Sequence, residues 1–198
     1  MISTLDHLII VVKDLDEAEK DYTKIFGMSP VWRGEHKELG TINSIFNLEN
    51  TYFELLASKG AGLGADLVSS ALEQDGEGLT GIVFGTDNIK DAHASIKSAG
   101  YGIGEISNGE GSNSDNVNIR RWQNLFLPPE LTRGLFSFVI EHTDGQLPAS
   151  NYQTSSISKL DHVVINTNDA DGLISVYQDV FKIRLALDKV IEHWKKRM

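Results

Sequence analysis

The sequence contains no cysteine, only four prolines and far fewer basic than acidic residues. The lack of cysteine excludes disulfide bonds, thiolate metal ligands and a cysteine nucleophile, and it is typical of a reducing compartment. The chain has 18 Lys and Arg residues and 28 Asp and Glu residues, so its net charge is −10. A net negative charge repels the phosphate backbone of a nucleic acid. No apolar run approaches the roughly 18 residues that a membrane-spanning helix needs. We therefore expect a cytoplasmic protein that binds neither nucleic acid nor a membrane.

One sequence pattern occurs twice in full and once more faintly. Leu-Asp-His opens an apolar run at Leu5 and again at Leu160, and each copy continues through an acidic helix entrance to a Tyr and a Phe four residues apart. The two aromatic pairs are Tyr22 with Phe26 and Tyr177 with Phe181. This spacing is about one helical turn, so each pair shares one helix face. A fainter copy begins at Leu79, which predicts a chain built from one repeated unit.

Hydrophobic periodicity predicts the order of elements in each unit. In the first, an apolar strand at 5–12 leads into a helix at 15–26, and three strand-like runs follow at 31–36, 41–48 and 51–58. This order is βαβββ, and residues 78–142 repeat it. Residues 108–116 are rich in Gly, Ser and Asn, which predicts a mobile loop.

The repeats also predict the domain organisation. The two units at 1–58 and 78–142 are expected to form one domain over residues 1–145, because a single four-stranded sheet with one helix would expose a whole face. The polar segment 146–158 is the expected linker. Residues 159–198 are expected to start a second, truncated domain, since one strand and one helix cannot close a sheet, or to dock on the first domain.

Three stretches carry a resemblance to a known family: LDHLIIVVKDLDEAEKDYTKIFGM, TYFELLAS and GLFSFVIEH. They resemble the vicinal oxygen chelate superfamily, which includes glyoxalase I and the extradiol dioxygenases, and in particular its glyoxalase-like domain branch. The resemblance implies an α+β fold in which paired βαβββ units form a cupped half-barrel, here with a partial third unit at the C-terminus. It also implies a divalent metal ion (Zn, Mn, Fe or Ni) on the concave face.

Carried onto this sequence, the four metal positions of the superfamily are His7, Glu54, Gly81 and Glu141. The resemblance thus implies His7, Glu54 and Glu141 as metal ligands and Glu54 and Glu141 as catalytic groups, whereas Gly81 offers no ligand. The residues themselves support part of this ligand assignment, because a carboxylate within an apolar strand is costly unless it is paired or bound to a cation. Alternation along the strands predicts that Glu54 lies with Tyr52 on the concave face, and that Glu141 does too. The alternatives are a structural histidine and two ordinary ion pairs with arginine.

Three functions remain open at this point. One is a metal-dependent lyase, isomerase or dioxygenase acting on a small substrate with neighbouring oxygens, in which a carboxylate moves the proton. The second is a metal-free module that binds or sequesters a small molecule on the same fold. A dimerisation or scaffold domain is the third, and a homodimer is compatible with each of them.

Overall fold

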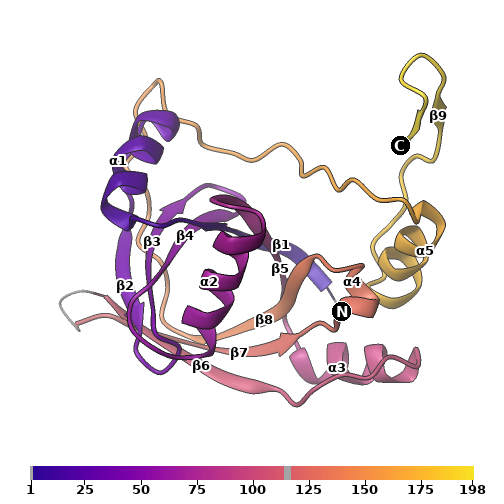
Figure 1. Cartoon of the computed structure of the whole chain (residues 1–198), viewed down its shortest axis with the longest axis horizontal. Helices are drawn as coiled ribbons and strands as arrows, with labels where there is room; N and C mark the ends of the chain where they lie inside the picture. The colour runs from indigo at the N-terminus through magenta and orange to yellow at the C-terminus, as the bar shows by residue number, and fades with distance from the viewer. Residues whose placement is uncertain (1, 114–116) are drawn as a thin grey trace.

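The computed structural model describes residues 2–113 and 117–198 of the chain, and eight of its strands form one closed barrel (Figure 1). None of the helices in these two ranges could cross a bilayer, because each is too short or too polar. The elements of the barrel and its helices are β1 (Ile2–Val11), α1 (Leu15–Phe26), β2 (Trp32–His36), β3 (Thr41–Asn47), β4 (Tyr52–Ser58), α2 (Leu63–Gln74), β5 (Gly78–Thr86), α3 (Ile89–Ser98), β6 (Ser107–Asn113), β7 (Ile119–Phe126), α4 (Pro129–Thr132) and β8 (Phe136–Asp144). The C-terminal elements are α5 (Ala170–Ser175), the π-helical turn η1 (Val176–Val180), β9 (Val190–Ile191) and β10 (Lys196–Arg197).

The order of strands around the barrel is β1-β4-β3-β2-β6-β7-β8-β5. Strand β1 pairs in parallel with β4 and antiparallel with β5, and β5 pairs in parallel with β8. The strand pairing between β2 and β6, which forms the seam of the barrel, is short: Gly34 lies opposite Asn113 and Glu35 opposite Ser112. The predicted α+β fold is confirmed, but this seam closes the strongly curved sheet as a barrel, where an open half-barrel was expected.

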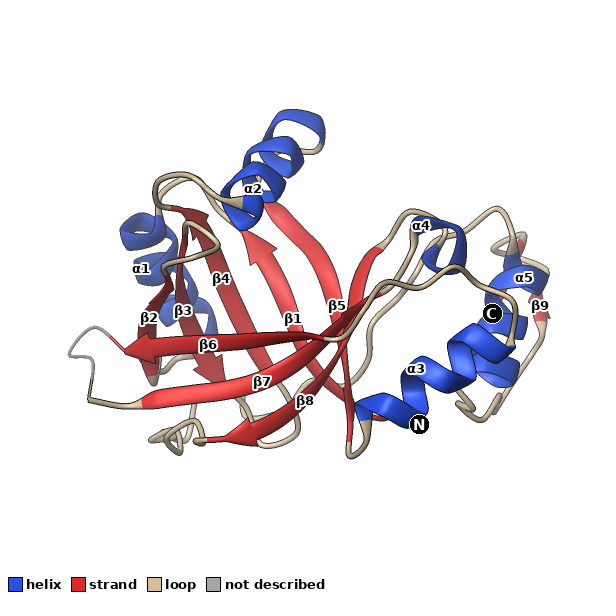
Figure 2. Cartoon of the chain, turned by 90° about the horizontal axis from the view of Figure 1, so that it is seen from below, coloured by secondary structure: helices blue, strands red, loops and turns tan. Residues whose placement is uncertain are grey.

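Helix α1 covers the outside of the first half of the barrel (Figure 2). Its bounds agree with the predicted helix, because Asp14 caps it by accepting the backbone N–H groups of Asp16 and Glu17. Gly27 ends it with a φ of 64°, a left-handed conformation that glycine adopts without strain. Phe26 then packs against β3 and β4, so α1 buries the outward-facing side chains of its own half.

The inside of the barrel holds a second apolar cluster that α2 joins. Ile9, Val11, Val83 and Phe138 point inward from three neighbouring strands, and Val68 of α2 packs on them fully buried. Figure 2 shows α2 lying at one end of the barrel, beyond the ends of β1 and β4. One end of the interior is therefore covered by a helix, and the cavity described below lies beside it.

The prediction of a mobile loop at 108–116 is wrong for the residues of this segment that the structure describes. Residues 107–113 form β6, which pairs with β7 and β2, while residues 114–116 lie outside the described residues. The glycines of this segment have a packing role, because a Cβ atom at Gly109 would overlap the indole ring of Trp122. The polar, Gly-rich composition that resembles a loop thus belongs to a strand that lies close against a tryptophan.

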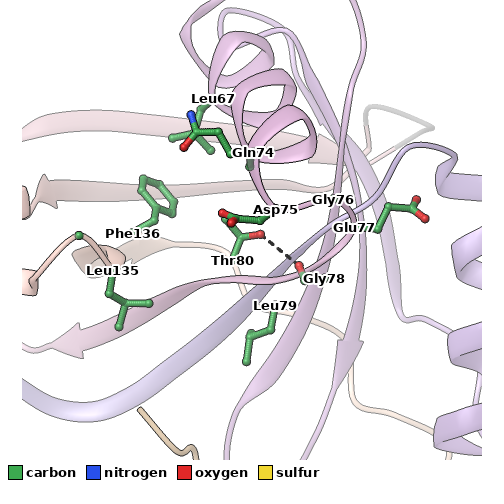
Figure 3. A pocket seen from close by; sticks show the side chains of 12 residues that line it. Leu67, Gln74, Asp75, Gly76, Glu77, Gly78, Leu79, Thr80, Leu135 and Phe136 are labelled. Atoms are coloured by element: carbon green, nitrogen blue, oxygen red, sulfur yellow. Dashed lines mark hydrogen bonds between the residues drawn. The ribbon is translucent and has the colours of Figure 1, made fainter. Parts of the chain in front are cut away.

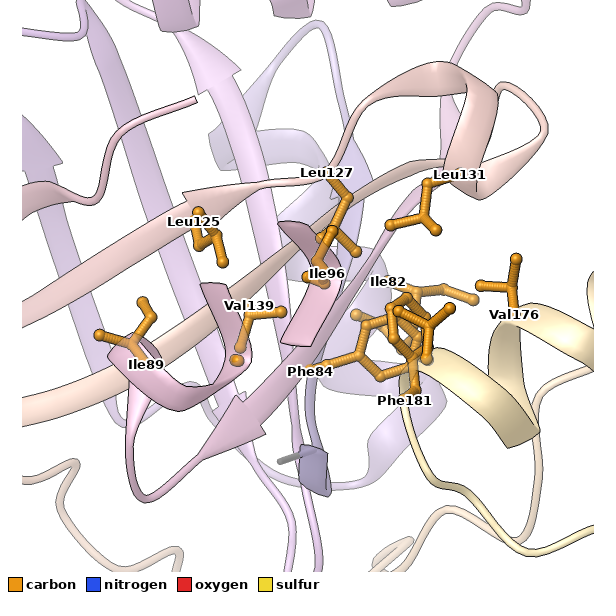
Figure 4. Close-up of a cluster of buried hydrophobic side chains, with 13 residues drawn as sticks. Ile82, Phe84, Ile89, Ile96, Leu125, Leu127, Leu131, Val139, Val176 and Phe181 are labelled. Atoms are coloured by element: carbon orange, nitrogen blue, oxygen red, sulfur yellow. The ribbon is translucent and has the colours of Figure 1, made fainter. Parts of the chain in front are cut away.

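The strand predicted after Leu160 is also wrong. Residues 159–168 have no strand partner, and the Asn50 side chain instead pairs with both the N–H and the C=O of Leu160, at 3.0 and 2.8 Å. The helix predicted next does form, as α5 and η1, and its Val176 and Phe181 enter the same core cluster as Phe84 of β5 (Figure 4). The tail thus docks on the outside of the barrel, and the division into domain, linker and second domain stays a prediction.

Candidate active site in the barrel

The barrel encloses a cavity of about 340 Å³ with a largely apolar wall. Its apolar lining comes from Ile9, Ile45, Leu56, Phe138 and Ile140. A set of polar side chains converges on the same space from six strands: His7, His36, Asn43, Tyr52, Glu54, Arg120, Asn124 and His142. A preformed apolar cavity with a few converging polar groups is the usual form of a small-molecule site.

His7 lies at the centre of this polar set and is 2 % exposed. Its Nδ1 is 2.7 Å from Oδ1 of Asp6, and its Nε2 is 3.4 Å from Oε2 of Glu54. The imidazole stacks on the ring of Tyr52 with 4.4 Å between centroids, and Phe138 meets it edge-on. Two carboxylates and two aromatic rings therefore hold one orientation of this histidine.

The surroundings make His7 and Glu54 an ion pair. Burial disfavours the charge on the His7 ring, but the hydrogen bonds to Asp6 and Glu54 and their negative charges outweigh it, so the pKa of His7 is raised. Burial likewise opposes the charge on Glu54, yet the hydrogen bond and charge of His7, with help from His36 and Asn43, lower the pKa of Glu54 to about 2. Glu54 is therefore a carboxylate at neutral pH, and it favours the protonated form of His7.

A hydrogen-bonded bridge leads from this pair to a second histidine. The Asn43 amide donates to Oε1 of Glu54 at 2.7 Å and lies 3.5 Å from Nε2 of His36. Burial is the main cause that lowers the pKa of His36, and the positive charges of Arg120 and His7 add to it against the opposing effect of Glu54. The pKa values of the two histidines of the cavity are therefore shifted in opposite directions, His7 toward the charged form and His36 toward the neutral form.

Sequence reasoning missed several of these residues. The carboxylate of Asp6 accepts from His7 and from His142, whose Nε2 is 3.1 Å away; although burial opposes its charge, these two partners lower its pKa. His36 and Arg120 were also not singled out. The signal was available for Arg120, since alternation places it on the same face of its strand as Trp122 and Asn124. Only the barrel shows that this face is the inner one.

Glu141 does not join His7 and Glu54, so its prediction as a ligand and catalytic group on the concave face is wrong. Its carboxylate accepts the backbone N–H of Ile89 at 2.8 Å, at the start of α3 outside the barrel. The face assignment of β8 was reversed: Val139 packs outward with the core under α3, whereas His142 lines the cavity. Both faces of this strand are buried along its first half, so alternation separates them without telling which points inward.

The metal-ligand set implied by the superfamily does not fit this cavity. Of the four positions, His7 and Glu54 line the cavity, Glu141 lies outside, and Gly81 has no side chain. The space at Gly81 is taken, since a Cβ atom there would lie 2.9 Å from the Phe136 ring and 3.3 Å from Ile9. Within residues 2–113 and 117–198 no three His, Asp or Glu side chains are arranged to hold a metal ion. We therefore derive no chemistry through a metal.

A second hollow of about 430 Å³ lies outside the barrel, between the end of α2 and the start of β5 (Figure 3). Its wall includes Asp75, Glu77 and the backbone turn in which Thr80 donates to the carbonyl of Gly78 at 3.1 Å. It contains no interacting acid and base such as His7 with Glu54. The barrel cavity is therefore the better candidate site.

Comparison with known protein families shows which family the chain belongs to. The profile of the family described as "Glyoxalase-like domain" matches residues 5–181. The chain belongs to this family. The match covers the barrel and the docked helix of the tail, and it confirms the resemblance to the vicinal oxygen chelate superfamily. No curated protein matches this glyoxalase-like chain.

Solved structures support the same fold at low sequence identity. A variant of Streptomyces coelicolor methylmalonyl-CoA epimerase in complex with 2-nitronate-propionyl-CoA is 20 % identical with a TM-score of 0.58, over 75 % of this chain and all (100 %) of its own. The methylmalonyl-CoA epimerase of Mycobacterium tuberculosis is 18 % identical with a TM-score of 0.57, over 72 % of this chain and 90 % of its own. A hypothetical protein from Bacillus halodurans is 18 % identical with a TM-score of 0.58, over 74 % of this chain and 98 % of its own. At this identity the similarity shows the fold alone.

Proposed function

We propose that this glyoxalase-like protein is an isomerase-type enzyme that moves a proton on a small molecule bound inside the barrel. The observation that carries the proposal is the pair of histidines whose pKa values are shifted in opposite directions, joined through Glu54 and Asn43 in one buried cavity. Groups whose surroundings push their pKa values apart are suited to act as acid and base at the same pH. The fold shared with epimerases is consistent with this reaction class.

In this mechanism His36 is the base and His7 the acid. The neutral Nε2 of His36 removes a proton from a carbon next to a carbonyl group, so the C–H bond breaks and the electron pair moves to the carbonyl oxygen. The His7 imidazolium stabilises the resulting negative charge in a water-poor site, where such an interaction is stronger than in water. Return of a proton to the carbon gives the isomer.

Glu54 and Asp6 act through His7. Each accepts one N–H of its ring, which keeps the imidazole charged and fixes its orientation. With a pKa of about 2, Glu54 is a weak base at neutral pH, so we assign it a positioning role in place of the proton shuttle that the sequence suggested.

The test is exchange of substrate hydrogen with solvent. The protein is incubated in D2O with carbonyl compounds that carry an exchangeable C–H bond, and deuterium incorporation is followed by NMR. His7→Gln and His36→Gln are each expected to slow exchange by roughly 10²–10⁴-fold, the usual contribution of one acid or base. His162→Gln is the matched control, because His162 contacts its own Asp161 in the same way but is exposed and far from the cavity.

The alternative is a metal-free binding module, and one observation favours it: both ring nitrogens of His7 are already engaged by carboxylates. In that case ligands raise the Tm but no deuterium enters them. Exchange that continues unchanged in both His7→Gln and His36→Gln would contradict the proposed mechanism.

A further inference from the structure

Arg120 is a buried cation that the acid–base mechanism does not use. It lies on the inner face of β7, is 7 % exposed, and lines the barrel cavity. Its guanidinium carbon lies 5.6 Å from the ring centroid of Tyr52 and 5.7 Å from that of Trp32. Two aromatic rings thus hold the charge beside the space in which a ligand would bind.

The protein does not neutralise this charge through an ion pair. Within the described parts of the chain, the Glu54 carboxylate of the cavity wall pairs with His7, and the neighbouring Asp6 pairs with His7 and His142. Among the residues that the structure describes, none makes a hydrogen bond with Nε of Arg120. A buried cation without a counter-charge is costly, and a natural structure rarely leaves one unpaired.

Other atoms of the cavity wall are unsatisfied as well. The amide oxygens of Asn43 and Asn124 are buried and accept no hydrogen bond, and both side chains line the cavity. Buried polar groups are normally paired, so three unpaired polar atoms on side chains that line one cavity indicate a place where a polar ligand binds.

We propose that Arg120 binds the carboxylate group of the substrate, so that the protein acts on small carboxylic acids with an apolar body. This inference rests on the proposed function only in taking the barrel cavity as the site. The planar guanidinium matches a carboxylate with two parallel hydrogen bonds. The cavity has a single arginine and no lysine among its described lining residues, which suits a monoanion better than a phosphate dianion. Its small volume and apolar wall suit a short hydrocarbon body.

The test compares ligands that differ only in the anionic group. Binding of isovalerate, its neutral amide isovaleramide, and isobutylphosphonate to the full chain is measured by calorimetry and by the shift in Tm, together with monocarboxylates from propionate to octanoate. Carboxylates are expected to bind and raise the Tm, whereas the amide binds at least about tenfold more weakly because Arg120 keeps no counter-charge. Equal binding of acid and amide, tighter binding of the phosphonate, or no binding by any carboxylate overturns the proposal.

Arg120→Met is the decisive variant, because it keeps an unbranched apolar stem and removes the guanidinium charge. It is expected to lose carboxylate binding, and its Tm without ligand should equal or exceed that of the wild type, since an unpaired buried charge is removed. Arg121→Met is the matched control: Arg121 lies on the opposite face, is exposed, and pairs with Glu110 and Asp144, so carboxylate binding should be unchanged. A lower Tm of Arg120→Met with carboxylate affinity retained shows a structural role and refutes the proposal.

The two proposals fail in different ways. Carboxylate binding that depends on Arg120 without any deuterium exchange supports this inference and rejects the enzymatic function. Exchange that depends on His7 and His36 but persists in Arg120→Met supports the enzymatic function and rejects the inference.

Discussion

At the residue scale, the pKa of each histidine in the cavity follows from the groups that its ring nitrogens contact. His7 has carboxylates on both ring nitrogens, whereas His36 has Thr41 at 3.0 Å on one side and the Asn43 amide on the other. Burial alone would make both histidines neutral. The two neighbouring carboxylates reverse that outcome for His7, and this difference creates an acid and a base from the same residue type.

Stability should therefore depend on pH through the His7–Glu54 pair. The folded pKa of His7 lies above its ordinary 6.5, so its contribution is complete below pH 6.5 and is lost as the pH rises through the raised value. The folded pKa of Glu54 falls from 4.5 to about 2, so its contribution is complete above pH 4.5 and is lost as the pH falls toward 2. The pair thus stabilises the fold most between pH 4.5 and 6.5.

Urea unfolding across this pH range measures the effect. Glu54→Gln should remove roughly 3 kcal/mol at neutral pH, from the pKa difference of Glu54. Below pH 4.5 the free energy of unfolding of Glu54→Gln should fall less steeply than that of the wild type, and the fall that remains comes from Asp6. At alkaline pH its loss of stability should begin at a lower pH, because His7 loses a partner. An unchanged pH profile in Glu54→Gln would show that the pair is not ionised in the folded state.

Metal binding gives a second prediction at this scale. Zn²⁺, Mn²⁺ and Ni²⁺ should leave the Tm of the wild type unchanged, because only His7 and Glu54 of the superfamily positions line the cavity. Gly81→His should lower stability by roughly 1–3 kcal/mol through overpacking against Phe136 and should gain no metal binding. A Tm that rises with metal concentration in the wild type and not in His7→Gln would overturn our account of the site.

At the element scale, β6 shows how one tryptophan determines the composition of a strand. Gly109 and Gly111 face the indole of Trp122, so the ring excludes a side chain at Gly109 and leaves little room for one at Gly111. The strand then pairs with both β7 and β2 and completes the barrel. A Gly-rich segment can therefore be an ordered wall element when a large ring fills the space of its side chains.

Substitution at Gly109 tests this packing. Gly109→Ala is expected to lower the free energy of unfolding by roughly 1–3 kcal/mol, because the new methyl group overlaps the Trp122 ring. Gly102→Ala is the control, since a Cβ atom there meets nothing within 4 Å. Combining Gly109→Ala with Trp122→Leu should recover part of the loss, and a purely additive double variant would argue against this contact.

At the scale of the whole molecule, the barrel and the C-terminal segment form one packed body. Val176, Val180 and Phe181 join a cluster with Ile82 and Phe84 of β5. The segment before them is also attached, because Tyr152 donates to the carbonyl of Asn47 at 2.9 Å and Ser156 to that of Gly27 at 2.7 Å. The tail covers apolar surface that the barrel would otherwise expose.

Phe181→Ala measures how strongly the tail and barrel are coupled. Phe181 is buried against Phe84, so its truncation should cost roughly 3–5 kcal/mol if both parts unfold together. Leu187→Ala, at an exposed position of the same tail, should have little effect. Limited proteolysis of Phe181→Ala should then cut first within 146–158, and a stable fragment of the wild type ending there would instead support two independent parts.

Much of this protein follows from the sequence by itself. The Leu-Asp-His pattern at Leu5, the Tyr–Phe spacing and the turn residues determine β1 and the place of α1, because these features are local, although the same pattern at Leu160 forms no strand. Alternation also separates Glu54 from Phe53 and His7 from Leu8. The tertiary structure decided the rest: β6 closes the barrel, Glu141 lies outside, and His36 and Arg120 join His7 inside. Alternation defines two faces of a strand, but where both are apolar only packing between distant strands determines which one faces the cavity.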